Sequence, residues 1–224
     1  MSTALILALI AIAGSLASTV VATFGLPAIQ AKRDSKKILD TYREPLIAAS
    51  FELQSRLYNI LALDFIGKWV KDERTGKRDA AIHSTLYVFA QFFAWRELIR
   101  REVQYLRFSR DEQTRLFAQL LRDIGEEFLA DRYGQQFMIW RVEQRGLGER
   151  MIIPADGGKA CLGYAAFLDQ RGMMDEWLNP IERDLENIDD GGRKRLTNVQ
   201  HLLVDLIRQL DDNKKRYPFA IDKA

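Results

Sequence analysis

Arginine, carboxylate and amide side chains are interspersed with aromatic residues in three stretches of this chain, at 56–59, 97–104 and 141–145. A guanidinium group recognises carboxylates and phosphates through paired hydrogen bonds and also stacks on aromatic rings. If the three stretches pack together, their polar side chains would line an anion-binding pocket. The candidate ligand-binding residues are Arg56, Asn59, Glu97, Arg101, Arg141 and Glu143.

The same pattern includes four more polar residues, which are Arg100, Gln104, Gln144 and Arg145. The alternative interpretation is a structural network of ion pairs that fixes the register of the helices, because a buried charge needs a partner. Both interpretations remain open at the level of the sequence.

Residues that bind metals are scarce. The two histidines, His83 and His201, have no glutamate three residues earlier, and Cys161 is the single cysteine. This pattern excludes the Glu-x-x-His pairs of di-iron bundles and argues against zinc, which takes Cys and His ligands. We therefore expect no metal and no cofactor, and we expect Cys161 to be a packed side chain.

Known catalytic motifs are also missing. Gly158-Lys159 has the Gly-Lys step of a phosphate-binding loop, but Ala160 follows the lysine and Ile153 replaces the first glycine. There is no Gly-x-Ser-x-Gly nucleophile elbow. This absence favours a non-enzymatic role, although an unfamiliar enzyme stays open.

The charge balance bears on possible partners. Lys and Arg number 33 against 31 Asp and Glu, which gives a net charge of +2. A general nucleic-acid-binding protein carries a strong basic excess, so we expect no nucleic-acid partner.

The beginning of the chain is apolar. Residues 1–31 contain no charged side chain, and Thr3 to Leu26 would span roughly 36 Å as a helix, enough to cross a bilayer. No basic residue precedes this run, and the run is too long for a signal peptide. The sequence therefore predicts an uncleaved transmembrane anchor over residues 1–31.

A basic cluster follows the predicted anchor and consists of Lys32, Arg33, Lys36 and Lys37. Basic residues beside a membrane span stay on the cytoplasmic side, and they attract anionic lipid. The prediction is a single-pass membrane protein with its amino terminus outside, a cytoplasmic body and contact with membrane lipid.

The candidate residues must be positioned by helices, which the apolar spacing predicts along the rest of the chain. Proline at a first helical position predicts a helix start at Pro45, and Ile152–Lys159 is predicted to be a loop. The other predicted helices cover 79–108, 109–134, 137–151, 161–170, 177–188 and 194–210.

These patterns predict an all-α fold with one N-terminal transmembrane helix followed by a multi-helix cytoplasmic bundle. The predicted division is 1–31 for the anchor, 32–44 for a basic juxtamembrane segment, 45–211 for the helical domain and 212–224 for a charged tail.

Four stretches, PLIAASFELQSRLYNIL, LIRREVQYL, EQRGLGERM and CLGYAAF, resemble a set of uncharacterised bacterial proteins with one amino-terminal span and a helical cytoplasmic body. The resemblance covers about Tyr42 to Phe167. It implies that architecture, and it brings no assigned activity and no catalytic residues.

Two functions remain as expectations. The first is a membrane-tethered interaction or scaffold module that associates with itself or with a protein partner. The second is a sensor, or an unfamiliar enzyme, that uses the arginine-rich interior to bind an anionic small molecule or a lipid headgroup.

Overall fold

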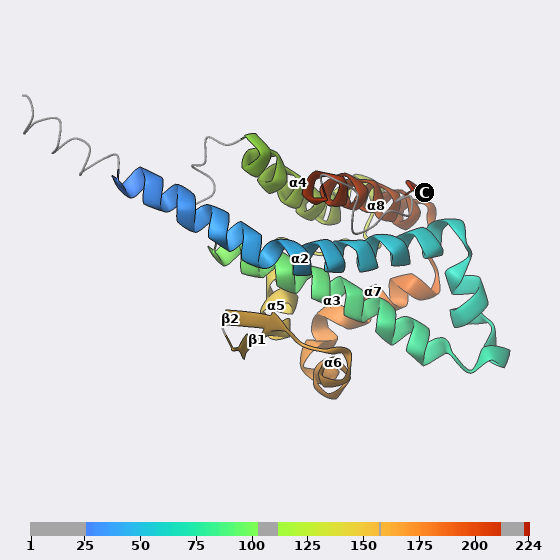
Figure 1. Ribbon diagram of the computed structural model, residues 1–224. Helices are drawn as coiled ribbons and strands as arrows, with labels where there is room; N and C mark the ends of the chain where they lie inside the picture. The colour runs from blue at the N-terminus through green and yellow to red at the C-terminus, as the bar shows by residue number, and fades with distance from the viewer. Residues whose placement is uncertain (1–25, 103–111, 157, 212–221) are drawn as a thin grey trace, which may run out of the picture. The chain divides into compact units, whose positions relative to one another are not determined.

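The computed structural model describes residues 26–102, 112–156, 158–211 and 222–224. Helices make up most of the described chain, and two short strands form the rest of its regular structure (Figure 1). Residues Tyr42–Ala224 form a compact unit. All the contacts discussed below lie within this unit.

The regular elements follow one another along the chain with short connections. The α-helices are α2 (Leu26–Ala62), α3 (Arg78–Glu102), α4 (Glu112–Leu129), α5 (Arg141–Met151), α6 (Tyr164–Gln170), α7 (Asp175–Glu186) and α8 (Asp190–Leu210). The short helices are η2 (Gly67–Lys71), η3 (Glu73–Thr75), η5 (Asp131–Tyr133) and η6 (Arg171–Met174), and the strands are β1 (Ile152–Ala155) and β2 (Gly158–Cys161).

Helix α3 packs against α5, α6, α7 and β2. Its apolar residues point to several sides, so Leu86, Phe89 and Leu98 are all fully buried. Helix α5 approaches α3 very closely, because a Cβ atom at Gly148 would lie 2.5 Å from the backbone oxygen of Phe93. Glycine at this position lets two helix backbones touch.

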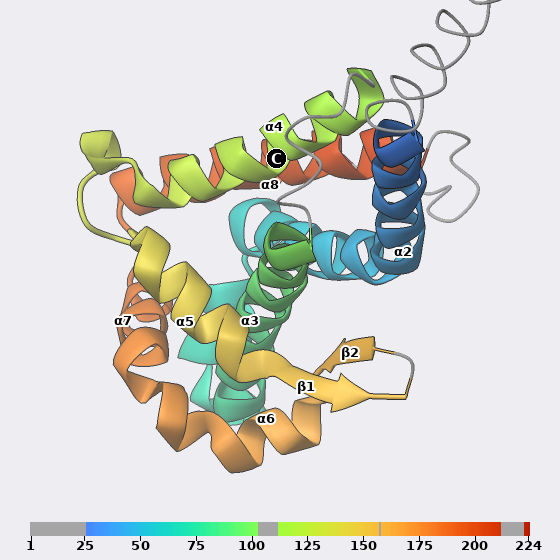
Figure 2. The same ribbon diagram turned by 90° about the vertical axis from the view of Figure 1, so that its left-hand side faces the viewer.

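Helices α4 and α8 lie side by side in both views (Figures 1 and 2). Each buries a stripe of apolar residues at the three-and-four spacing expected for an amphipathic helix. The ring of Phe128 on α4 contacts Phe89 and Phe93 on α3, with centroids 5.9 and 5.3 Å apart. Aromatic contacts thus join the α4–α8 pair to the α3–α5 pair.

Several predicted boundaries are wrong. Helix α2 runs from Leu26 straight through Pro45, so no helix starts at that proline. The predicted loop over Ile152–Lys159 is instead most of an antiparallel hairpin, in which Ile152 pairs with Cys161. The hairpin forms because Ile152 and Ile153 have the β-branched shape that suits a strand.

The remaining helices differ in their first residues. α3 begins at Arg78, α5 at Arg141, α6 at Tyr164, α7 at Asp175 and α8 at Asp190. α8 starts earlier than predicted because the carboxylate of Asp189 accepts a hydrogen bond from the backbone N–H of Gly192 at 2.6 Å. This cap allows two glycines to lie inside the first turn.

The predicted membrane span is corrected by the structure. Residues 1–25, which hold most of it, lie outside the described residues, and no helix in the described ranges is long and apolar enough to cross a bilayer. Helix α2 takes in the end of the apolar run but continues through Lys32, Arg33, Lys36 and Lys37. The fold class with one transmembrane helix is therefore wrong for the described chain, as is the single-pass location derived from it.

Candidate functional site

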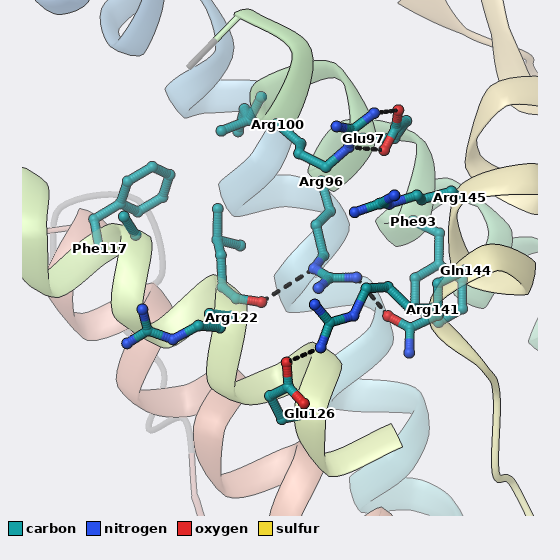
Figure 3. Close-up of a pocket in the computed structure, with 13 residues that line it drawn as sticks. Phe93, Arg96, Glu97, Arg100, Phe117, Arg122, Glu126, Arg141, Gln144 and Arg145 are labelled. Carbon is teal, nitrogen blue, oxygen red and sulfur yellow. Dashed lines mark hydrogen bonds and ion pairs between the residues drawn. The ribbon is translucent and has the colours of Figure 1, made fainter. Parts of the chain in front are cut away.

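A cavity of about 580 Å³ lies between α3, α4 and α5. It opens where the α3–α5 pair faces the α4–α8 pair, and Figure 3 shows the side chains that surround it. Its lining residues are Phe93, Arg96, Glu97, Ile99, Arg100, Phe117, Ala118, Leu121, Arg122, Glu126, Arg141, Gln144 and Arg145.

The charged residues of the lining are mostly arginines. Residues four apart lie on one face of a helix, so Arg96 and Arg100 form one pair on α3, and Arg141 and Arg145 form another on α5. Arg122 comes from α4. Five arginines against Glu97 and Glu126 leave the lining with a net charge of +3.

The side chain of Arg96 is held in a fixed orientation. Its Nε donates to the backbone oxygen of Leu121 at 3.0 Å, and one of its Nη atoms donates to the side-chain oxygen of Gln144. The Gln144 amide in turn donates to the backbone oxygens of Gly125 and Ile139, at 3.0 and 2.7 Å. This network ties α3, α4 and α5 together around one guanidinium group.

The guanidinium of Arg96 lies directly against the backbone of α4. A Cβ atom at Gly125 would come within 1.9 Å of an Nη atom of Arg96, so only glycine leaves room for it. An arginine has five N–H donors, of which Leu121 and Gln144 take two. The other three have no hydrogen-bond acceptor among the residues that the structure describes.

Burial lowers the pKa of Arg96 to about 10. The charges of Glu97 and Glu126 act in the opposite direction, while the like charges of Arg141 and Arg145 lower the pKa further. Figure 3 shows Arg141 and Arg145 extending from α5 towards Arg96. Arg96 is therefore a cation in an unfavourable environment that still keeps its proton at neutral pH.

Glu97 is the acidic centre on the other side of the cavity. Its carboxylate is 3% exposed and accepts hydrogen bonds from Arg100, at 2.6 Å, and from Arg101, at 2.8 Å. Burial would raise the pKa of Glu97, but these hydrogen bonds and charges outweigh burial and hold the pKa below its usual value. Arg100 is thus neutralised within its own helix.

The two arginines of α5 differ in their partners. Arg141 forms an ion pair with Glu126 of α4, and both side chains are about half exposed. Arg145 has neither an ion pair nor a hydrogen bond to any described residue. Two guanidinium groups in the cavity, those of Arg96 and Arg145, therefore lack a carboxylate partner within the described part of the chain.

The structure separates the sequence candidates into three places. Glu97 and Arg141 line the cavity, whereas Arg101 bridges Glu97 and Glu149 beside it. Glu143 accepts a hydrogen bond from the backbone N–H of Trp140 and so caps α5.

Arg56 and Asn59 do not line the cavity. Both lie on α2, where Arg56 donates to Thr85 at 3.0 Å and covers the ring of Phe65 at 4.3 Å. The other early candidates with a place in the lining are Arg100, Gln144 and Arg145, and Gln104 lies outside the described residues.

Sequence reasoning missed Arg96 and Arg122, and it took Glu126 for part of a solvated helix face. The spacing of Arg96 and Arg100 repeats that of Arg141 and Arg145, and this repeat was a usable signal. Arg122 and Glu126 carry no comparable signal, because charged residues alternate with apolar ones along the whole of α4.

Among the described residues, no group of three or more His, Cys, Asp or Glu side chains is placed to hold a metal ion. Comparison with protein-family models, with curated proteins and with solved structures found no match to this chain. A functional conclusion must therefore come from the geometry of the cavity.

Proposed function

We propose that the protein binds an anionic small molecule in the cavity between α3, α4 and α5. The observation that supports this most directly is Arg96, a partly buried arginine that has free N–H donors and no carboxylate partner among the described residues. An unpaired charge in a protein interior lowers stability unless something else compensates it. A bound anion would provide that compensation.

The dimensions and chemistry of the cavity fit this proposal. Small-molecule sites commonly measure about 300–1,000 Å³ and combine apolar walls with a few convergent polar groups. The apolar walls here include Phe93, Phe117 and Leu121, and the polar groups converge from three helices. A structural ion-pair network would account for Glu97 and Glu126, but it leaves Arg96 and Arg145 without counter-ions.

Thermal unfolding with a panel of small anions, at constant ionic strength, tests this proposal. We expect at least one anion to raise the melting temperature of the wild type, because a ligand at ten times its Kd adds about 1.4 kcal/mol of stability. Arg145→Gln should remove the effect without unfolding the protein, since Arg145 contacts no described partner. If every anion affects both proteins equally, the cavity does not bind anions.

A second candidate function is association with another protein or with a second copy of this chain. The observation that favours it is the exposure of apolar side chains at the start of α5, where Trp140 is 57% and Val142 is 68% exposed. Native mass spectrometry of the wild type and of Trp140→Ser would test it. A complex that persists unchanged in the variant would show that this surface is not the interface.

A further inference from the structure

We infer that the ligand of this cavity is a phosphate monoester with an apolar substituent. This inference rests on the anion-binding function proposed above and specifies its chemistry. Three features of the lining carry it, namely its charge, the directions from which its arginines approach and the position of its apolar wall.

The charge of the lining favours a dianion. Glu97 neutralises Arg100, and Glu126 neutralises Arg141, so the charges of Arg96 and Arg145 remain. A phosphate monoester carries about −1.5 to −2 charges at pH 7, whereas a carboxylate or a sulfate ester carries one. A phosphate monoester therefore matches the two uncompensated charges.

The arrangement of the arginines favours a tetrahedral group. Arg96 reaches the cavity from α3, while Arg141 and Arg145 reach it from successive turns of α5 (Figure 3). A planar carboxylate offers two oxygens in one plane. A phosphate presents three terminal oxygens that can accept hydrogen bonds from guanidinium groups in different directions.

The remaining wall is apolar and lies on the side of α4. Phe117, Ala118 and Leu121 occupy one face of that helix, and Ile99 adds to them from α3. This surface would contact the organic part of the ligand and contribute affinity through buried apolar area. Inorganic phosphate would satisfy the arginines but leave this wall in contact with water.

Isothermal titration of the full-length protein with matched ligands tests this inference. Phenyl phosphate should bind at least about tenfold more tightly than inorganic phosphate, which lacks the ring, and than phenyl sulfate or benzoate, which carry a single charge. Between pH 5 and pH 8, the affinity for phenyl phosphate should rise as its second proton leaves near pH 6. The affinity for phenyl sulfate should stay constant.

Three variants locate the binding. Arg96→Gln and Arg145→Gln should each weaken phenyl phosphate at least about tenfold, because each removes a charge-assisted hydrogen bond. Arg74→Gln is the matched control, since Arg74 is 90% exposed in η3 and should leave the affinity unchanged. Arg145→Gln keeps the test valid if Arg96→Gln does not fold.

The outcomes separate the two proposals and the source of the phosphate. Equal affinity for benzoate, phenyl sulfate and phenyl phosphate would overturn the phosphate inference and leave anion binding intact. No binding of any anion would overturn both. A short-chain, water-soluble phosphatidic acid that binds while phenyl phosphate does not would identify a lipid headgroup as the source, and the reverse result would identify a soluble ester.

Discussion

Arg195 on α8 shows how this chain places a charge in its interior for a structural purpose. Its side chain is fully buried and donates to three backbone oxygens, those of Ala130, Gly134 and Gln136. These residues form the connection from α4 to α5. In contrast to Arg96, Arg195 uses its N–H groups to hold a loop, which leaves little room for a ligand role.

Replacing Arg195 with Met should lower the free energy of unfolding by about 3 kcal/mol or more, because three carbonyls lose a charged donor in a buried place. Urea denaturation would measure the change. The exposed neighbour Lys194→Met is the control and should change stability by no more than about 0.5 kcal/mol. Equal effects of the two substitutions would show that the three hydrogen bonds contribute nothing.

Cys161 provides a test based on protonation. Burial, together with the charge of Glu52, raises the pKa of its thiol to about 12. The thiolate is the reactive form, so a raised pKa leaves less of it at pH 8. A disulfide reagent should therefore modify Cys161 at least about tenfold more slowly in the native protein than in urea. Equal rates would contradict the environment described here.

Helix α5 contributes two of the cavity arginines, and its position depends on contact with α3. The close approach at Gly148 fixes where Arg141 and Arg145 lie relative to Arg96. Glu143 caps the start of the helix through the Trp140 backbone, at 2.6 Å. Two residues outside the cavity thus determine the geometry inside it.

The substitution Gly148→Ala tests this dependence. Alanine favours a helix by about 1 kcal/mol over glycine, but overpacking costs about 1–3 kcal/mol, and the clash is with a backbone oxygen that cannot rotate away. We expect a net loss of stability in urea denaturation and weaker anion binding. Gly172→Ala, where a Cβ atom meets nothing within 4 Å, should show neither effect. A stabilised Gly148→Ala protein would refute the close packing of α3 and α5.

Over the compact unit of Tyr42–Ala224, the cavity is a junction between two helix pairs. A ligand that bridges them should stabilise both, whereas the β1–β2 hairpin and α6 contribute no lining residue. We expect bound phenyl phosphate to slow amide hydrogen exchange in α3, α4 and α5 but not in the hairpin or α6. Slowing spread evenly over all elements would instead indicate general stabilisation.

Local patterns in the sequence were enough to predict most of the helices. The apolar spacing in α4 and α8 depends only on the 3.6-residue period of a helix, and both helices bury the residues so predicted. Caps and strands were less predictable. The Asp189 cap and the hairpin depend on hydrogen bonds that also suit a loop, and the apolar beginning of the chain predicted a membrane span that no described helix provides.

By itself, the sequence determined that the body is helical and that arginines accompany aromatic residues in it, because both properties belong to neighbouring positions along the chain. Only the tertiary structure decided which charges are neutralised. Glu126 reaches Arg141, and Gln144 reaches Arg96. These pairs are set by how helices distant in sequence pack, so Arg56 became part of the framework while Arg96 and Arg145 became the uncompensated charges of a cavity.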